Sequence, residues 1–242
     1  MAIQKEEVFT IRSIDYKESD SILTLLGRKG KFSAIAKGAR KSTSKFGSAF
    51  DLLNFSEVVY YAGSGLAFLK EGELLESWEG LKRREGLIGA GLRSARLLNL
   101  LLEENQPEAS TYSLFGATLK ALDHSPPRGE IVELGFYLKL LSLLGLKPSL
   151  IDCVKCGAKL DGGSFKFSNS LGGVLCENCA SGGEDELGEA LRRTLIKLSQ
   201  LPQGKVARVR LSESSAKRAF ALLDRFAAYH LPDRGRKILR RD

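Results

Sequence analysis

Four cysteines are the residues of this 242-residue chain whose type and spacing most clearly predict chemistry. They form two pairs, Cys153 with Cys156 and Cys176 with Cys179, and nineteen residues separate the pairs. Two intervening residues let one turn aim both sulfurs at the same ion, and a tetrahedral site needs two such turns. Because four thiolates saturate a zinc ion, we predict one structural Zn²⁺ per chain and no catalysis at the metal.

A second pattern is a segment of concentrated positive charge. Residues 21–50 contain seven basic side chains and no acidic one. Such a strip attracts a phosphate backbone and gains affinity by releasing counterions. The residues predicted to grip phosphates are Lys37, Arg40, Lys41 and Lys45, and those predicted to extend the strip are Arg28, Lys29 and Lys31. Phe46, in a predicted loop, is expected to stack on bases in preference to Phe32. A solvated basic loop is the alternative.

Patterns that could support catalysis are sparse. Lys159-Leu160-Asp161-Gly162 fits the KxDG pattern of nucleotidyltransferases that form a lysyl-nucleotide adduct, but so short a pattern arises by chance. Glu18 and Asp20 could hold magnesium for a nuclease, although turn and N-cap roles explain them more simply. The chain contains no GxxxxGK[ST] and no GxSxG. We therefore predict no enzyme, with a zinc-containing nuclease or nucleotidyltransferase as the alternative.

The elements that must position these residues begin with β-strands. Alternating or β-rich stretches separated by glycine-bearing turns predict five strands, at residues 8–14, 22–26, 32–36, 55–61 and 66–70. Five short strands in about eighty residues are typical of the OB-fold, a small barrel that often binds single-stranded nucleic acid. In this arrangement the basic residues 37–45 form the loop between the third and fourth strands.

The hydrophobic period becomes helical after residue 80. The predicted helices lie at residues 92–102, 111–122, 131–144, 187–198 and 215–229, and the later two are expected to pack back onto the earlier ones. We predict an α+β fold with four parts: an OB-fold domain of residues 1–80, a first helical part of residues 81–150, a four-cysteine zinc finger of residues 151–182, and a second helical part of residues 183–242.

The net charge of +8 is concentrated near the C-terminus, since residues 183–242 hold fourteen basic and eight acidic side chains. A solvated end is the commoner outcome for such a basic region, but it could also be a second phosphate-binding surface. The candidates for that surface are Arg192, Arg193, Lys197, Lys217, Arg218 and the tail cluster Arg234, Arg236, Lys237, Arg240 and Arg241. No apolar run approaches the roughly 20 residues that a membrane-spanning helix needs. The N-terminus lacks the pattern of a secretory signal, which predicts a cytoplasmic protein without disulfides.

Several ordered motifs together resemble the RecO family of bacterial recombination mediators. They begin with Tyr16-Lys17-Glu18-Ser19-Asp20, Gly30-Lys31 and Lys37-Gly38-Ala39-Arg40, and continue with Leu143-Leu144-Gly145-Leu146-Lys147-Pro148, Cys153-Val154-Lys155-Cys156-Gly157 and Gly172-Gly173-Val174-Leu175-Cys176. The resemblance spans nearly the whole chain. It implies an N-terminal OB domain, a helical domain and an inserted zinc finger, which agrees with the organisation predicted from the residues.

The resemblance also implies a role in DNA repair without bond chemistry. Members of the family bind single- and double-stranded DNA, anneal complementary strands coated by single-strand binding protein, and work with RecR to load RecA at gaps. It further implies a nucleoid-associated bacterial protein, and a pocket on the helical domain for the C-terminal tail of single-strand binding protein. An adaptor that binds proteins through its helices, with the basic strip merely solvated, is the remaining alternative.

Overall fold

The structure is a computed structural model that describes residues 2–63, 65–106, 109–124 and 128–231. Its contacts divide the chain into two compact units, residues 1–127 and 128–242. The tail cluster from Arg234 to Arg241 lies outside the described residues. The two units are defined by contacts between residues in space. The domain boundaries predicted near residues 80, 150 and 182 are based on changes in the sequence pattern, and they stay predictions.

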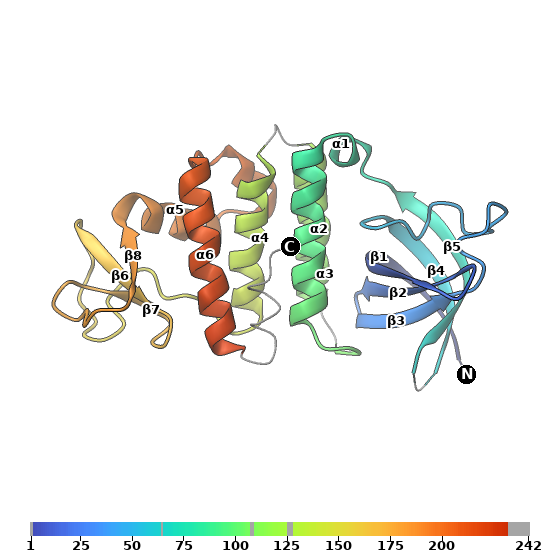
Figure 1. The fold of residues 1–242 in the computed structure, drawn as a ribbon, viewed down its shortest axis with the longest axis horizontal. Helices are drawn as coiled ribbons and strands as arrows, with labels where there is room; N and C mark the ends of the chain where they lie inside the picture. The colour runs from blue at the N-terminus through green and yellow to red at the C-terminus, as the bar shows by residue number, and fades with distance from the viewer. Residues whose placement is uncertain (1, 64, 107–108, 125–127, 232–242) are drawn as a thin grey trace. The chain divides into compact units, whose positions relative to one another are not determined.

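The first unit is built on a closed five-stranded barrel (Figure 1). Its strands run in the order β1-β2-β3-β5-β4, with bounds β1 (Ala2–Tyr16), β2 (Asp20–Gly27), β3 (Gly30–Ala36), β4 (Phe55–Ala62) and β5 (Ala67–Glu76). All neighbours are antiparallel except β3 and β5, which pair in parallel. The predicted OB-like barrel is confirmed.

Strand β1 holds the barrel together because it pairs with two neighbours. Its first half, Ala2 to Phe9, pairs with β4, and its second half, Val8 to Tyr16, pairs with β2. The register of the β1–β2 pair shifts between Thr10 and Arg12. A bulge of this kind bends a strand and increases its twist, which lets one long strand curl through both sides of a small barrel.

Alternation along the strands fills the barrel with apolar side chains, and the loop between β3 and β4 closes one of its ends. Leu23, Ala34, Val58 and Leu69 belong to the buried cluster inside the barrel. Two aromatic rings of the loop, Phe46 and Phe50, lie 4.8 Å apart and join the same cluster. This loop is attached to the C-terminal end of β3 and the N-terminal end of β4.

The described residues of the first unit also form three helices: α1 (Glu79–Lys82), α2 (Glu85–Leu101) and α3 (Ala109–Asp123). Helix α2 packs on β1 and α3 packs on β2. Phe9 of β1 meets the rings of Tyr112 and Phe115 of α3 at centroid distances of 5.1 and 5.3 Å. Between barrel and helices, the buried Trp78 donates its indole N–H to the carbonyl of Leu53 at 3.1 Å.

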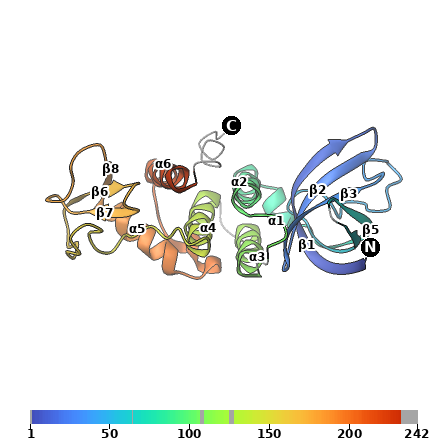
Figure 2. The ribbon, with the colours of Figure 1, turned by 90° about the horizontal axis from the view of Figure 1, so that it is seen from below.

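The second unit is organised around a helix that is buried on nearly every side. Its elements are α4 (Gly129–Leu143), β6 (Ser164–Ser168), β7 (Gly173–Leu175), β8 (Asp185–Gly188), α5 (Glu189–Gln200), the 3₁₀ helix η1 (Gln203–Arg208) and α6 (Glu213–His230). Helices α5 and α6 pack on α4 (Figure 2), and η1 also packs on α4. A β-carbon at Gly135 would lie 3.0 Å from Val206 Cγ1, so glycine allows η1 to approach α4. No described helix is long and apolar enough to cross a membrane.

A three-stranded sheet accompanies the cysteine segment, with the strand order β7-β6-β8. The predicted helix of residues 187–198 begins two residues later than expected, because Leu187 and Gly188 still belong to β8, where Leu187 pairs with Phe165 of β6. Both side chains are buried, and Phe167 of β6 packs edge-on against Phe226 of α6 at 5.8 Å. The fold prediction of a barrel, a helical region and a cysteine segment is confirmed, with this sheet as an addition.

Candidate nucleic-acid interface and metal centre

The four cysteines come together in space although they are separated in the sequence. Cys153 and Cys156 lie between α4 and β6, whereas Cys176 and Cys179 follow β7. Their sulfur atoms all lie within 4.8 Å of one another, and Cys156 Sγ is 3.8 Å from Cys176 Sγ. Tetrahedral zinc with Zn–S bonds of about 2.3 Å requires sulfur–sulfur distances of about 3.8 Å. The cluster is therefore compatible with zinc, and it is the only group of three or more potential metal ligands among the residues that the structure describes.

Two tight turns aim the sulfurs inward. Gly157 donates its N–H to the carbonyl of Cys153 at 2.8 Å and adopts a φ of 74°, a left-handed conformation that glycine tolerates. In the second turn, Cys179 donates its N–H to the carbonyl of Cys176 at 3.0 Å. Backbone hydrogen bonds therefore fix the turn of each CxxC pair independently of a metal ion.

The thiols influence one another strongly, as expected for a site that needs a cation. Burial alone would raise the pKa of Cys153, but backbone N–H groups of Cys176, Cys156 and Lys155 outweigh it and lower the pKa to about 6. Hydrogen bonds with Cys156 and Cys176 raise the pKa of Cys179 to about 12. Four thiolates at these distances repel one another, and a divalent metal ion among them would supply the positive charge that offsets this repulsion.

The base of the cysteine segment is held by Arg192 of α5, which is 5% exposed. Its guanidinium donates to the carbonyls of Leu150, Ile151 and Leu160, on either side of the first cysteine pair, at 2.8 to 3.2 Å. The sequence makes Arg192 a candidate for a second phosphate-binding surface. It is instead a structural residue, because its guanidinium is directed into the protein.

The predicted phosphate-binding residues of the first unit are mostly exposed. Lys37, Arg40, Lys41 and Lys45 all lie in the loop that follows β3 and reach solvent. Arg40 forms an ion pair of 3.1 Å with Asp15, in which both side chains stay largely exposed. Lys45 donates to the carbonyl of Lys70. An exposed ion pair contributes little free energy, so a phosphate can replace Asp15 as the partner of Arg40 at small cost.

Arg28 and Lys29 lie in the turn between β2 and β3, at the opposite end of β3 from that loop. The Arg28 guanidinium stacks on the ring of Tyr112 at 5.3 Å, and the Lys29 ammonium donates to Gln4 Oε1 at 3.3 Å. The predicted strip is therefore two exposed basic groups rather than one continuous row.

Lys31 separates these groups, and its position corrects the prediction made for it. The residue is 6% exposed, and its ammonium donates to the carbonyl of Asn99 at 2.8 Å. Its own carbonyl accepts the N–H of Asn105 at 2.8 Å. Lys31 thus ties β3 to the end of α2 and does not offer its charge to a phosphate.

The expected order of the two phenylalanines is also reversed. Phe46 does lie in a loop, but its ring is 4% exposed because the loop folds back over the end of the barrel. Phe32 is half-buried, stacks on Tyr60 at 4.8 Å, and lines an open pocket. Phe46 therefore stabilises the barrel, and Phe32 is the ring that a base could reach.

An apolar row on the outside of the barrel escaped the sequence prediction. The strand pairings align six residues side by side across the barrel, each paired with the next. In order, they are Ile14, Ile22, Ile35, Phe68, Tyr61 and Ile3. Phe68 is 39% exposed, and the Lys37 ammonium lies 5.6 Å from its ring centroid. A second such pair lies at the start of the β1–β2 turn, where Lys17 is 5.4 Å from the ring of Tyr16. Aromatic rings beside cations are the features that single strands recognise on OB-folds.

Two family models cover this chain. Residues 1–78 match the model described as Recombination protein O N terminal, and residues 87–239 match that described as Recombination protein O C terminal. The chain belongs to the RecO family of DNA repair proteins. The resemblance noted in its motifs is confirmed, and with it a role in DNA repair and recombination.

Curated RecO proteins are similar over almost the full length. A protein from Anaeromyxobacter dehalogenans (strain 2CP-C) is 35% identical over 238 residues, which cover 96% of this chain and 91% of the relative. One from Symbiobacterium thermophilum is 30% identical over 241 residues, which cover 98% of this chain and 95% of the relative. Both are named DNA repair protein RecO.

Asp20 and Lys159, which the sequence offers as possible catalytic residues, make structural contacts in this RecO-family chain. Asp20 Oδ1 accepts the N–H of Gly38 at 2.8 Å, which fixes the start of the basic loop. Lys159 is exposed, and its backbone pairs with Asp152 beside the first cysteine turn. Neither the Glu18 and Asp20 pair nor the KxDG match belongs to a cluster of metal ligands in the described part of the chain.

Proposed function

We propose that this RecO-family chain is a non-enzymatic recombination mediator that binds single- and double-stranded DNA. It anneals complementary strands coated by single-strand binding protein and, with RecR, promotes the loading of RecA at gaps. The observation that best supports the DNA-binding step is the outer face of the barrel at β1, β3 and β5. There Phe68 and Tyr16 each carry a lysine beside the ring, and the exposed basic loop of residues 37–45 follows directly.

This face suits a role that leaves sequence choice to base pairing. Exposed ammonium and guanidinium groups neutralise backbone phosphates whatever the sequence, and exposed rings stack on any base. Two strands whose charge is partly neutralised repel one another less, so complementary strands can pair. The proposal assigns this neutralisation to Lys37, Arg40, Lys41 and Lys45, with Arg28 and Lys29 as a separate group.

Zinc is the metal that we propose for the four cysteines, at one ion per chain. Four sulfur ligands favour zinc among common metals, and four protein ligands leave no open position for substrate. Cys153, Cys156, Cys176 and Cys179 would then hold the segment together and take no part in DNA chemistry.

Replacing Lys37, Arg40, Lys41 and Lys45 together by alanine is expected to lower affinity for single-stranded DNA about a hundredfold at 0.1 M salt or below. Each neutralised phosphate contributes about 0.7 to the slope of log affinity against log salt on single strands. The slope should therefore become about 3 less steep in the variant. Fluorescence anisotropy of a labelled oligonucleotide at several salt concentrations measures both quantities.

The matched control removes the same charges from the second unit, by alanine at the exposed Lys155, Lys159, Lys205 and Arg210. This variant should keep the steep salt dependence. Equal slopes for the wild type and the loop variant would show that the basic loop is merely solvated.

Phe68→Ala is expected to weaken binding of single-stranded DNA by about 1 to 3 kcal/mol, the usual contribution of one base stacked on an aromatic ring. Binding of a blunt duplex should change much less, because its bases are already stacked on one another. The comparison needs only the two affinities for each protein at one salt concentration. A loss of the same size on both substrates would place Phe68 in the scaffold and not in base contact.

A further inference from the structure

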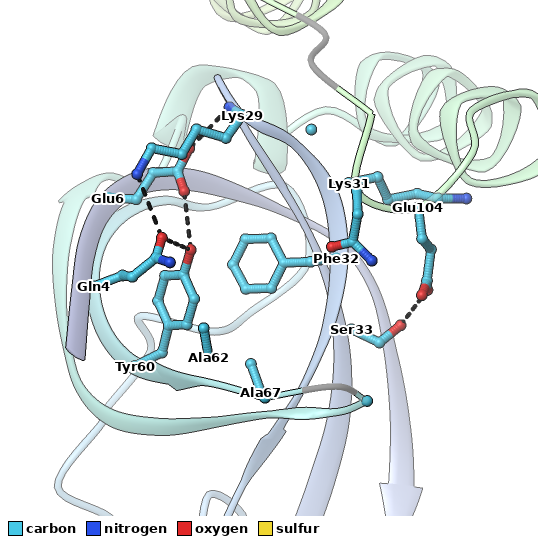
Figure 3. Close-up of a pocket in the computed structure, with 14 residues that line it drawn as sticks. Gln4, Glu6, Lys29, Lys31, Phe32, Ser33, Tyr60, Ala62, Ala67 and Glu104 are labelled. Carbon is cyan, nitrogen blue, oxygen red and sulfur yellow. Dashed lines mark hydrogen bonds between the residues drawn. The ribbon is translucent and has the colours of Figure 1, made fainter. Parts of the chain in front are cut away.

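A pocket opens at the end of the barrel that the basic loop leaves uncovered (Figure 3). It is lined by the first residues of β3 and the last residues of β4, whereas the loop carrying Phe46 joins the other ends of these strands. Its volume is about 230 Å³. That is below the 300 to 1,000 Å³ of a site for a drug-sized molecule, and suits one flat ring system rather than a whole nucleotide.

One wall of the pocket is aromatic and partly open. Phe32 and Tyr60 stack with centroids 4.8 Å apart and ring planes at 23°. Tyr60 is buried, while Phe32 is half-buried and turns toward the pocket, as Figure 3 shows. Small residues, Ala62 and Ala67, line the pocket nearby and leave room beside the rings. A planar ligand can therefore extend the stack begun by these two side chains.

The polar edge of the pocket is rich in hydrogen-bond acceptors. The Tyr60 hydroxyl donates toward Gln4 Oε1 at 3.0 Å and Glu6 Oε2 at 3.2 Å, and the backbone N–H of Lys29 donates to Glu6 Oε1 at 3.1 Å. These contacts fix the Glu6 carboxylate in place and leave lone pairs on both oxygens. Burial, together with the charge of Glu6, raises the pKa of Tyr60 to about 12, so its hydroxyl stays a donor.

The charges around the pocket exclude a phosphate as its natural occupant. Two carboxylates, Glu6 and Glu104, line it, and Glu104 is held by the hydroxyl of Ser33 at 2.6 Å. Lys29 stands at the rim, but the ammonium of Lys31 is directed to the Asn99 carbonyl. A neutral planar ligand with two adjacent N–H donors fits this arrangement, and guanine presents such an edge through N1 and its amino group.

The pocket is also next to the proposed DNA-binding face. Ala67 lines the pocket, and the following residue, Phe68, lies on the outer face beside Lys37. A DNA strand that stacks one base on Phe68 can place a neighbouring base in the pocket, across the barrel edge between β4 and β5. We propose that this pocket is a subsite for one unstacked base of bound single-stranded DNA, with a preference for guanine set by Glu6. The inference rests on the proposed function.

Two substitutions that each remove one negative charge, Glu6→Gln and Glu7→Gln, test the proposed base subsite. Wild type is expected to bind an oligothymidylate carrying a few guanines at least about fivefold more tightly than plain oligothymidylate, since one matched bidentate base contact gives discrimination of that size or more. Glu6→Gln should bring the two affinities within twofold. Glu7→Gln, a change on the neighbouring exposed residue, should keep the preference. Plain oligothymidylate reports in every protein whether the outer face still binds.

A second measurement separates the pocket from the outer face. Saturation-transfer NMR with free guanosine should show a signal that disappears in Glu6→Gln and persists in Glu7→Gln. Normal oligothymidylate binding without any guanine preference would overturn the pocket and leave the proposed function standing. Absence of all oligonucleotide binding would overturn the proposed function, and the guanosine signal would then decide the pocket alone. A signal from N-acetylarginine amide with none from guanosine would assign the pocket to a protein side chain and overturn the base subsite.

Discussion

Removing the proposed zinc ion, or replacing Cys153 and Cys176 by serine, is expected to unfold the segment of residues 151–182 within the 242-residue chain. Structural zinc contributes about 10 to 16 kcal/mol to the folding of zinc-finger peptides, and here the four sulfurs lie within 4.8 Å of one another. Without the ion, no bonds to a metal would join the two CxxC turns. Limited proteolysis should therefore cut this segment rapidly after chelation.

Metal analysis of protein purified without chelators should give one zinc ion per chain, and none in the serine variant. Lys155→Ala changes an exposed residue inside the same CxxC turn and should leave both the zinc content and the proteolysis pattern unchanged. Zinc far below one ion per chain, together with a segment that resists protease, would show that the four cysteines do not hold a structural zinc ion.

Arg192→Met is expected to destabilise the second unit by about 3 to 5 kcal/mol, the usual cost of breaking a buried ion pair. The guanidinium uses each of its donor nitrogens: Nε and Nη2 reach Glu189, and Nη1 and Nη2 reach three backbone carbonyls. It also stacks on Phe165 at 4.9 Å. Methionine fills similar space but removes the donors to the buried carbonyls of Leu150 and Leu160. Urea unfolding of the zinc-loaded protein measures the loss.

Arg192→Lys should recover little of this stability, since one ammonium cannot reproduce a planar fork that reaches several acceptors. Arg193→Met is the matched control, because Arg193 also pairs with Glu189 from the same helix but is 71% exposed. It should cost well under 1 kcal/mol. A loss of similar size at both positions would mean that Arg192 acts only through its charge.

The same residue gives stability a defined pH dependence. Hydrogen bonds from Arg192, followed by those from Arg193, hold the pKa of Glu189 below its usual range. A lowered carboxyl pKa stabilises the fold above the unfolded-state pKa, near 4.3, and this contribution is lost as the pH falls through the folded-state value. In Arg192→Met the two pKa values should lie closer together, so the decline of unfolding free energy below pH 5 should be shallower than in the wild type.

Local sequence pattern was sufficient where neighbouring residues decide the structure. Strand alternation predicted most strand ends to within two residues, and the exceptions are the start of β1 and the end of β5. The CxxC spacing predicted the cysteine cluster. In both cases neighbouring residues determine the geometry. Side chains alternate between the two faces of a strand, and one turn brings two sulfurs together.

Long-range contacts decided the positions that pattern could not. Lys31 is buried by the carbonyl of Asn99, 68 residues away, and no local signal distinguishes it from the exposed Lys29. Phe46 has the sequence surroundings of a loop, but only the closed barrel provides a space for its ring. Phe68 lies in a predicted strand, yet its outward direction follows from barrel closure through the short parallel pairing of β3 and β5.

The chain has a single tryptophan, Trp78, and its indole is buried against the carbonyl of Leu53 within the first unit. Its intrinsic emission is therefore a spectroscopic probe of residues 1–127 and is silent on residues 128–242. Chelation or Arg192→Met should alter far-ultraviolet circular dichroism at denaturant concentrations where the emission maximum has not yet shifted to the red. The two signals together can resolve which unit melts first without any added label.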